Sequence, residues 1–175
     1  MSLSIRAPKR RSAALRSLLQ ALVLVALAGC GFHLRGALEI PADLAPIYLQ
    51  PQVGSPVMLA VKEQLTGGTV PLASSPDKAK LILRITAEGR SSRVVATNDA
   101  GKVLAYELHY LVTYEAVTAD GKVRIPKQKL DLVRTFDNPD VEVLGKQLEE
   151  AQIYQEFAVD AADRILMRLR TTLLR

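Results

Sequence analysis

The sequence predicts an α+β fold, a two-layer sandwich in which about four mostly antiparallel strands carry two helices packed on one face. Two observations support this. Long stretches between residues 80 and 136 alternate apolar and polar residues, as half-buried strands do. Stretches before and after them repeat apolar residues at a spacing of four, as amphipathic helices do. The expected order is β-α-β-β-β-α.

The first 29 residues predict a secretory leader. Basic residues precede the apolar run 18–28, which is shorter than the roughly 20 residues of a bilayer-spanning helix. Leu27, Ala28 and Gly29 precede Cys30 and resemble the bacterial lipoprotein signal. An ordinary signal peptide with an incidental cysteine is the alternative. Because Cys30 is the only cysteine of the chain, it has no disulfide partner within it, and lipidation explains its presence.

Lipidation divides the chain into three parts. Residues 1–29 are removed, 30–45 form a lipidated extended segment, and 46–175 form the folded domain. The expected modification is an S-diacylglycerol and an N-acyl group on Cys30, with no other cofactor. Each buried CH₂ of such chains contributes ~0.8 kcal/mol, so two or more chains hold a protein stably on a membrane. Gly31 is not the aspartate associated with inner-membrane retention, so resemblance to other lipoproteins implies sorting to the outer membrane.

Removal of the leader changes the charge of the protein. The whole chain carries a net charge of +5, but five basic residues and no acidic residue lie in the leader. The mature chain therefore has 18 basic and 18 acidic residues, which removes the main support for nucleic-acid binding. The range 78–134 still holds 11 basic and 6 acidic residues. One interpretation is that these charges are solvated strand surface. The alternative is that they bind an anionic ligand, in which case the basic side chains should converge at one end of the sheet.

Prolines and glycines delimit the first elements of the domain. A short strand is expected at 47–50, between two prolines. Ser55 followed by Pro56 is a typical helix start, and the glycine pair 67–68 a typical end, so a helix is predicted over 56–66.

Three strands are predicted next, over 80–95, 103–118 and 122–136. In the first, every second residue from Leu81 to Ala87 lies on one face. Every second residue from Arg84 to Glu88 lies on the other face. In the second, the tyrosines share one face, while His109 lies on the other with Glu107. The turns carry Asn-Asp-Ala-Gly at 98–101 and Asp-Gly at 120–121. Pro126 marks a bulge or a sheet edge in the third strand.

A long helix is predicted over about 146–173, since apolar residues recur at a spacing of four from Ile153 to Leu173. Acidic residues crowd its early turns and arginines its late turns, which suits the helix dipole.

No pattern in the sequence indicates an enzyme or a metal site. The only histidines are His33 and His109, and the only cysteine is expected to be acylated. No phosphate-binding loop, dinucleotide fingerprint or nucleophile elbow is present. His109 is most simply a polar residue on the second face of the sheet.

The residues directly after the leader carry a family resemblance. The stretch 30–36, Cys-Gly-Phe-His-Leu-Arg-Gly, is similar to the mature start of the LptE family, the lipopolysaccharide (LPS) assembly lipoproteins of the Gram-negative outer membrane. The stretch 134–139, Arg-Thr-Phe-Asp-Asn-Pro, resembles the end of that family's last strand. The element order also matches, so the resemblance covers the chain from residue 30 to about 174. Some members carry a longer polar tail, whose role does not transfer.

The resemblance implies a non-enzymatic protein that plugs the LptD β-barrel in a one-to-one complex, helps assemble it, and assists LPS delivery to the outer leaflet. It implies an anchor in the periplasmic leaflet of the outer membrane, a domain within the barrel lumen, and direct LPS binding. The candidate LPS-binding residues are Arg93, Lys102 and Lys146. The alternative is a free-standing lipid- or cell-wall-binding lipoprotein without a barrel partner.

Replacement of Cys30 by alanine tests the anchor. Without the thiol no diacylglycerol can be attached, so we expect an uncut or misprocessed precursor that is poorly held at the membrane. Mass spectrometry of the N-terminal peptide of the unsubstituted mature protein should show an acylated Cys30. An unmodified thiol there would contradict the lipoprotein interpretation.

Overall fold

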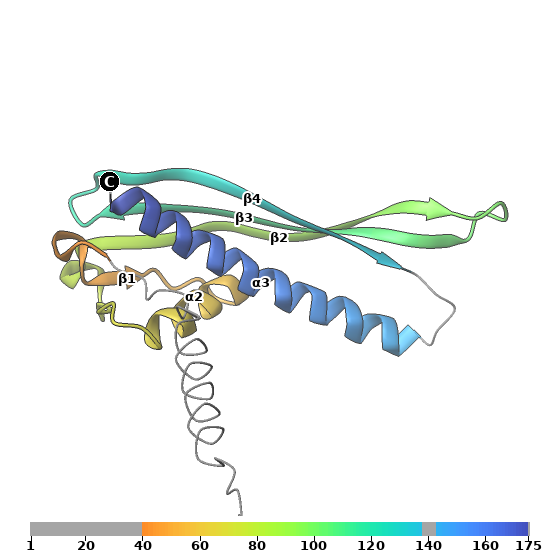
Figure 1. The fold of residues 1–175 in the computed structure, drawn as a ribbon, viewed down its shortest axis with the longest axis horizontal. Helices are drawn as coiled ribbons and strands as arrows, with labels where there is room; N and C mark the ends of the chain where they lie inside the picture. Colours follow the sequence, from red (N-terminus) through yellow and green to blue (C-terminus); the bar gives the residue numbers. More distant parts are fainter. Residues whose placement is uncertain (1–39, 138–142, 175) are drawn as a thin grey trace, which may run out of the picture. The chain divides into compact units, whose positions relative to one another are not determined.

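A four-stranded sheet with two helices on one face makes up residues 40–137 and 143–174, which are the residues that the computed structural model describes (Figure 1). The elements are η1 (Ala42–Leu44), β1 (Ile47–Leu49), α2 (Pro56–Thr66), η2 (Pro76–Lys78), β2 (Leu81–Thr97), β3 (Val103–Thr118), β4 (Val123–Asp137) and α3 (Val143–Leu173), where η denotes a 3-10 helix. The predicted α+β class and the order β-α-β-β-β-α are confirmed.

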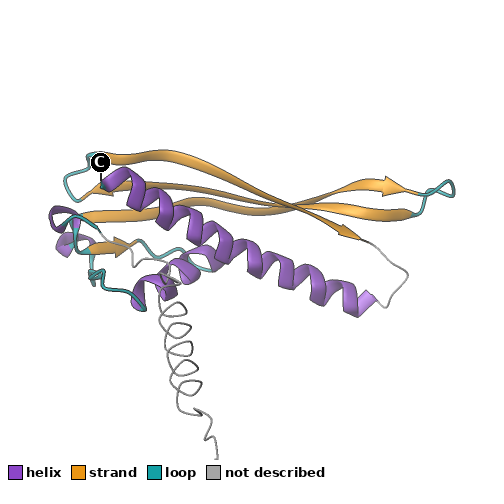
Figure 2. Cartoon of the chain, viewed as in Figure 1, coloured by secondary structure: helices purple, strands orange, loops and turns teal. Residues whose placement is uncertain are grey.

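The sheet is mixed, with the spatial order β1-β2-β3-β4. The short strand β1 runs parallel to β2 and pairs with only Leu81–Leu83, whereas β2, β3 and β4 are long and antiparallel. Figure 2 shows these three strands as long ribbons, of which β2 and β3 extend furthest, to their shared turn. Helix α2 provides the crossover that a parallel β1–β2 pair requires.

Helix α2 begins where the sequence predicts. The Ser55 hydroxyl oxygen accepts a hydrogen bond of 3.0 Å from the backbone N–H of Met58, and Pro56 occupies the first turn. The Gly67 N–H donates to the Glu63 carbonyl at the end. The predicted bounds 56–66 are confirmed.

The core lies between the helices and one face of the sheet, which we call the inner face. From β3 it takes the predicted alternate residues, including Tyr110 and Tyr114, and from α3 it takes residues at the predicted spacing, including Phe157 and Ile165. The rings of Tyr110 and Phe157 stack with centroids 6.2 Å apart. The other face of the sheet, which we call the outer face, carries His109 as predicted. Its partners across the sheet, Ser91 of β2 and Val133 of β4, lie on the same face.

A β-bulge overturns the predicted faces of β2. Ile85 pairs with Tyr114, but the next residue of β3, Thr113, pairs with Ala87, so Thr86 is an extra residue. Beyond it the alternation is reversed. Ala87 is exposed on the outer face, where the sequence predicted it to share a face with Leu81, and Glu88 turns to the inner face.

Smaller differences concern the ends of elements. Ala42–Leu44 form a 3-10 helix where extended chain was expected, and Leu44 is buried in the core. Helix α3 begins at Val143, before the predicted start near 146. The bulge or edge predicted at Pro126 is confirmed on both counts, since β4 is an edge strand and its register shifts there. Residues 30–39 of the predicted lipidated segment lie outside the described residues.

Phe157→Ala tests the packing of α3. The side chain is 4% exposed, so its removal should cost roughly 3–5 kcal/mol of unfolding free energy. Met167→Ala on the same helix removes an apolar side chain that is 60% exposed and should change stability by less than about 0.5 kcal/mol. Denaturant unfolding of both variants measures the difference, and equal losses would contradict the assigned helix face.

Candidate functional site

The predicted lipidation site, Cys30, lies outside the described residues. The acyl anchor and its place in the membrane therefore stay predictions.

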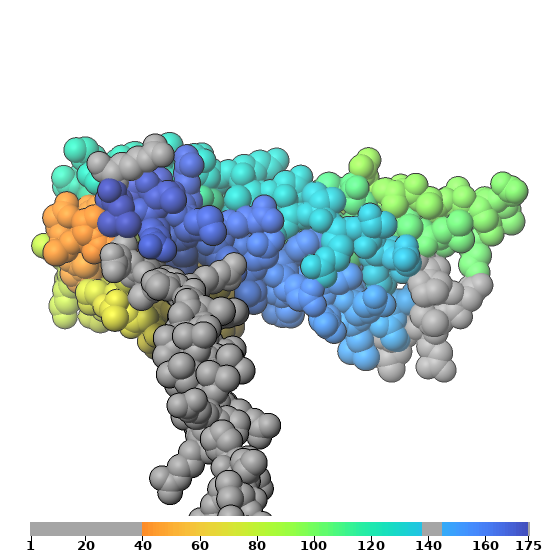
Figure 3. Space-filling model, viewed as in Figure 1, coloured from red at the N-terminus to blue at the C-terminus, as the bar shows by residue number. Residues whose placement is uncertain are grey.

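The three candidate LPS-binding residues belong to one end of the domain but not to one surface. Arg93 lies on the outer face of β2, Lys102 in the turn between β2 and β3, and Lys146 in the early turns of α3. Figures 1 and 3 show that this turn and the start of α3 lie at the same end, where the β2–β3 hairpin projects. Arg93 is ion-paired with Glu107 at 2.6 Å, on the face away from α3.

The basic residues of 78–134 do not converge at that end. Lys122 lies in the turn between β3 and β4, Arg124 lies at the start of β4, and Lys127 follows in β4, all at the opposite end of the sheet. The expectation of a single basic end is therefore wrong, because the basic residues occupy both ends of the long strands.

On the outer face a row of ionic side chains crosses three strands. Arg93 of β2 contacts Glu107 of β3, whose Oε1 also lies 2.8 Å from His109 Nε2. The other ring nitrogen, Nδ1, lies 3.0 Å from Asp131 Oδ1 of β4. Both nitrogens of His109 face carboxylates, and only the protonated ring can donate to both.

These contacts shift the pKa values of the row. Hydrogen bonds to Asp131 and then to Glu107 raise the pKa of His109 above its ordinary value. Hydrogen bonds from Arg93 and then from His109 lower the pKa of the Glu107 carboxyl. The row is thus a charged, internally paired patch that joins the strands.

On the inner face Glu88 joins three elements. Its two carboxylate oxygens accept hydrogen bonds from the hydroxyls of Ser55, at the start of α2, and Tyr110, on β3. Burial and then the bond to Glu88 raise the pKa of Tyr110. We call Ser55, Glu88 and Tyr110 the inner junction.

Beside the inner junction Arg90 lies over two aromatic rings, 4.7 Å from the centroid of Tyr154 and 5.8 Å from that of Tyr110. The Tyr154 hydroxyl donates to the Ser91 carbonyl at 3.2 Å, which ties α3 to β2. A cleft of about 370 Å³ opens between these two elements, lined by Arg90, Ser91, Ser92, Gln147, Glu150, Ala151 and Tyr154.

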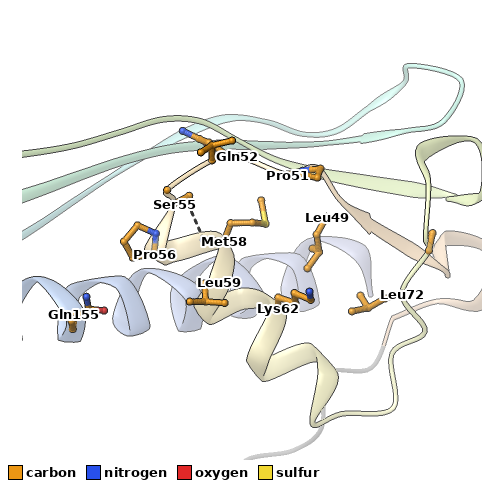
Figure 4. Close-up of a pocket in the computed structure, with 13 residues that line it drawn as sticks. Leu49, Pro51, Gln52, Ser55, Pro56, Met58, Leu59, Lys62, Leu72 and Gln155 are labelled. Carbon is orange, nitrogen blue, oxygen red and sulfur yellow. Dashed lines mark hydrogen bonds between the residues drawn. The ribbon is translucent and has the colours of Figure 1, made fainter.

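A larger groove of about 700 Å³ lies next to β1 and α2 (Figure 4). Its walls are mostly aliphatic, with Leu49, Leu59 and Leu72 around the opening and Lys62 as its cation. Val53 and Leu59 are exposed in it. Such a surface suits an apolar chain and not a phosphate group.

The sequence analysis did not identify Glu88, Arg90 or Tyr154 as neighbours. The periodicity of β2 placed Glu88 on the wrong face because a bulge leaves no sequence signal in a run of ordinary strand residues.

Within residues 40–137 and 143–174 no group of three or more His, Cys, Asp or Glu side chains is placed to hold a metal ion. Over the same part of the chain, no helix has both the length and the apolar character needed to cross a membrane.

The model of the LptE family, described as lipopolysaccharide-assembly, matches residues 38–169. The LPS-assembly lipoprotein LptE of Photorhabdus laumondii is 30% identical over 156 residues, which cover 89% of this chain and 85% of that protein. The chain belongs to the LptE family. The family resemblance of the sequence is thereby confirmed, and so is a role as a lipoprotein in LPS assembly at the outer membrane.

Solved structures agree with the fold of the LptE family domain. The solution structure of lipoprotein B from Nitrosomonas europaea has a TM-score of 0.67 and 25% identity, and the comparison covers 80% of this chain and 90% of that one. The crystal structure of the rare lipoprotein B from Shewanella oneidensis has a TM-score of 0.62 and 21% identity, over 72% and 92% of the two chains.

Titration of His109 tests the outer-face row. We expect its pKa to lie above 6.5 in the folded protein, and Asp131→Asn to lower it, because that carboxylate is the largest contributor to the shift. Protonated His109 therefore stabilises the folded protein at pH values below its ordinary pKa of 6.5. This contribution is lost as the pH rises through the raised pKa of His109 in the folded protein.

The measurement is the pH dependence of the ring proton resonances by NMR. Asp120→Asn, in the turn between β3 and β4, removes the same charge away from the ring and should leave the His109 titration unchanged. An unchanged titration in Asp131→Asn would contradict the assigned contacts.

Proposed function

We propose that this lipoprotein plugs the LptD β-barrel from within its lumen, helps the barrel to assemble, and assists LPS delivery to the outer leaflet with direct LPS binding. The observation that carries the proposal is membership of the LptE family over nearly the whole domain, residues 38–169. A covalent lipid on Cys30 would hold the protein at the periplasmic leaflet of the outer membrane.

The surface of the domain is suited to a polar lumen. The outer face carries ion pairs, among them Arg84 with Glu115 and Arg93 with Glu107. The exposed side of α3 carries the Arg164–Asp160 pair. A plug is surrounded by the wall of its barrel, and a barrel lumen is polar, so both sides of a plug should be polar and largely neutral. The mature chain meets this condition with a net charge of zero.

LPS binding would use cations at the hairpin end, since Lys and Arg bind phosphate oxygens through charge-assisted hydrogen bonds. Arg93 would have to share its guanidinium with Glu107, to which it is ion-paired. Lys102 in the turn and Lys146 on α3 approach this end from two elements. A test of the site therefore changes Lys102 and Lys146 together, because they lie on two elements at the same end of the domain.

The double variant Lys102→Glu/Lys146→Glu should weaken LPS binding by the purified domain about tenfold, because two attractions become two repulsions of about 0.2–1 kcal/mol each. Stability should change by less than about 0.5 kcal/mol for each residue. A filter or fluorescence titration with LPS, with a melting curve beside it, measures both.

The matched control is Lys122→Glu/Lys127→Glu, which changes the charge equally at the opposite end of the sheet. The control should bind LPS as the unsubstituted domain does. Equal loss of binding in the two double variants would show a general charge effect and remove the candidate site.

Co-purification separates the barrel-plug proposal from a free-standing lipid- or cell-wall-binding lipoprotein. In mild detergent, an LptD barrel should be recovered with this protein at a one-to-one ratio. The Lys102→Glu/Lys146→Glu variant should recover it too, because these residues are assigned to the ligand. Recovery of the lipoprotein alone, from membranes that contain the barrel, would favour the free-standing alternative.

A further inference from the structure

Most of β2 has a neighbour on one side only. β3 pairs with β2 from Leu81 to Thr97, but β1 pairs with it only over Leu81–Leu83. Within the part of the chain that the structure describes, no strand pairs with the other side of β2 from Arg84 onward, so this side is an open sheet edge. Figure 1 shows β1 beside one end of β2 alone. An open edge presents N–H and C=O groups that can pair with a further strand.

The bulge at Thr86 determines which backbone groups face this edge. Before it, the carbonyl of Leu83 faces the β1 side, where it accepts from the Gln50 N–H at 3.0 Å. Backbone direction alternates along a strand, and the extra residue reverses the alternation. The residues that face the open edge beyond the bulge are Glu88, Arg90, Ser92 and Val94.

The two edges of the sheet differ in their protection against pairing. The free edge strand β4 carries Pro126, which has no N–H, followed by Lys127 and Lys129. Prolines and lysines are the usual devices that prevent strand addition. The range 87–96 of β2 contains neither residue type, and glycine and serine occupy its centre. The β2 edge is thus long and unguarded.

The open edge borders a cleft that could receive side chains. Arg90 and Ser92 of β2 form one wall of the cleft, and Gln147, Glu150 and Tyr154 of α3 form the other. In strand addition, main-chain hydrogen bonds hold the peptide while its alternate side chains enter pockets along the edge. The cleft between β2 and α3 provides such a pocket directly beneath the edge.

The charges along the edge specify the occupant. Of the three arginines in residues 84–95, Arg84 and Arg93 are ion-paired with Glu115 and Glu107 on the outer face. Glu88 already accepts hydrogen bonds from Ser55 and Tyr110, so Arg90 is the cation that this edge offers to a partner. Among the described residues Arg90 has no ion pair, and Val94 is 48% exposed. An acidic side chain opposite Arg90 and an apolar one opposite Val94 would complement them.

We propose that the β2 edge at residues 88–94 binds an extended acidic segment of a partner protein as an added strand. The partner's backbone pairs with Arg90, Ser92 and Val94, and one of its carboxylates meets the Arg90 guanidinium in the cleft. The inference goes beyond the barrel-plug proposal and does not depend on it, since a plug can be held without strand addition.

The probe is a synthetic peptide of about nine residues, added to the purified folded protein. It carries one glutamate and one valine four residues apart, so that an added strand places them on one face, opposite Arg90 and Val94. Amide exchange measured by NMR should slow about tenfold at Arg90, Ser92 and Val94, since these N–H groups become hydrogen-bonded. Gly89 and Ser91 already face β3 and should change little. The same peptide with lysine in place of glutamate should bind at least about tenfold more weakly, as the charges require.

Ser92→Pro removes one outward N–H and should weaken peptide binding about tenfold, whereas Ser92→Ala keeps it and should bind within about twofold of the unsubstituted domain. A peptide with proline at its centre makes the same test without altering the domain. Absence of slowed exchange, equal binding of the lysine peptide, or equal binding of the proline peptide would overturn the proposal. Slowed exchange that depends on domain concentration alone would assign the edge to a second copy and overturn it too.

Discussion

The extra residue at Thr86 in β2 is the constraint on which the arrangement of the domain depends. Before it, β2 supplies aliphatic side chains to the inner face, and after it Glu88 and Arg90 take their place. The Glu88 carboxylate then ties the start of α2 to β3 through Ser55 and Tyr110. A buried hydroxyl without a partner costs about 1–3 kcal/mol. A shift of α2 that broke these hydrogen bonds would incur that cost, so the inner junction helps to fix the position of α2. The same reversal decides which backbone groups face the open edge of β2.

Opposite charges on the surface of the domain are paired locally. Arg93, Glu107, His109 and Asp131 neutralise one another across three strands of the outer face. Arg134 and Glu156 do the same between β4 and α3. Surface pairs of this kind contribute little to stability, with a median near 0–1 kcal/mol. Their effect is on the surface itself, where paired charges suit enclosure by a polar wall.

The sequence was sufficient for everything that local patterns determine. The helix 56–66 follows from Ser55 and Pro56, and β3 follows from an unbroken alternation. The faces of β2 beyond Thr86 could not be predicted, because a bulge depends on how two strands pair and not on the composition of one. The cleft at Arg90 could not be predicted either, since Tyr154 lies 64 residues further along the chain. The family resemblance supplied the functional prediction, and the candidate ligand residues still rest on it.

The central claim is that the domain is enclosed by one barrel. Photo-cross-linking from three exposed positions tests it most directly. A photoreactive phenylalanine analogue replaces Ala87 on the outer face, Asp99 in the hairpin turn, or Met167 on α3. A plug in a lumen is surrounded, so we predict that all three positions cross-link to the same LptD barrel in intact cells. Cross-links to the barrel from only one of these surfaces, or from none, would contradict enclosure.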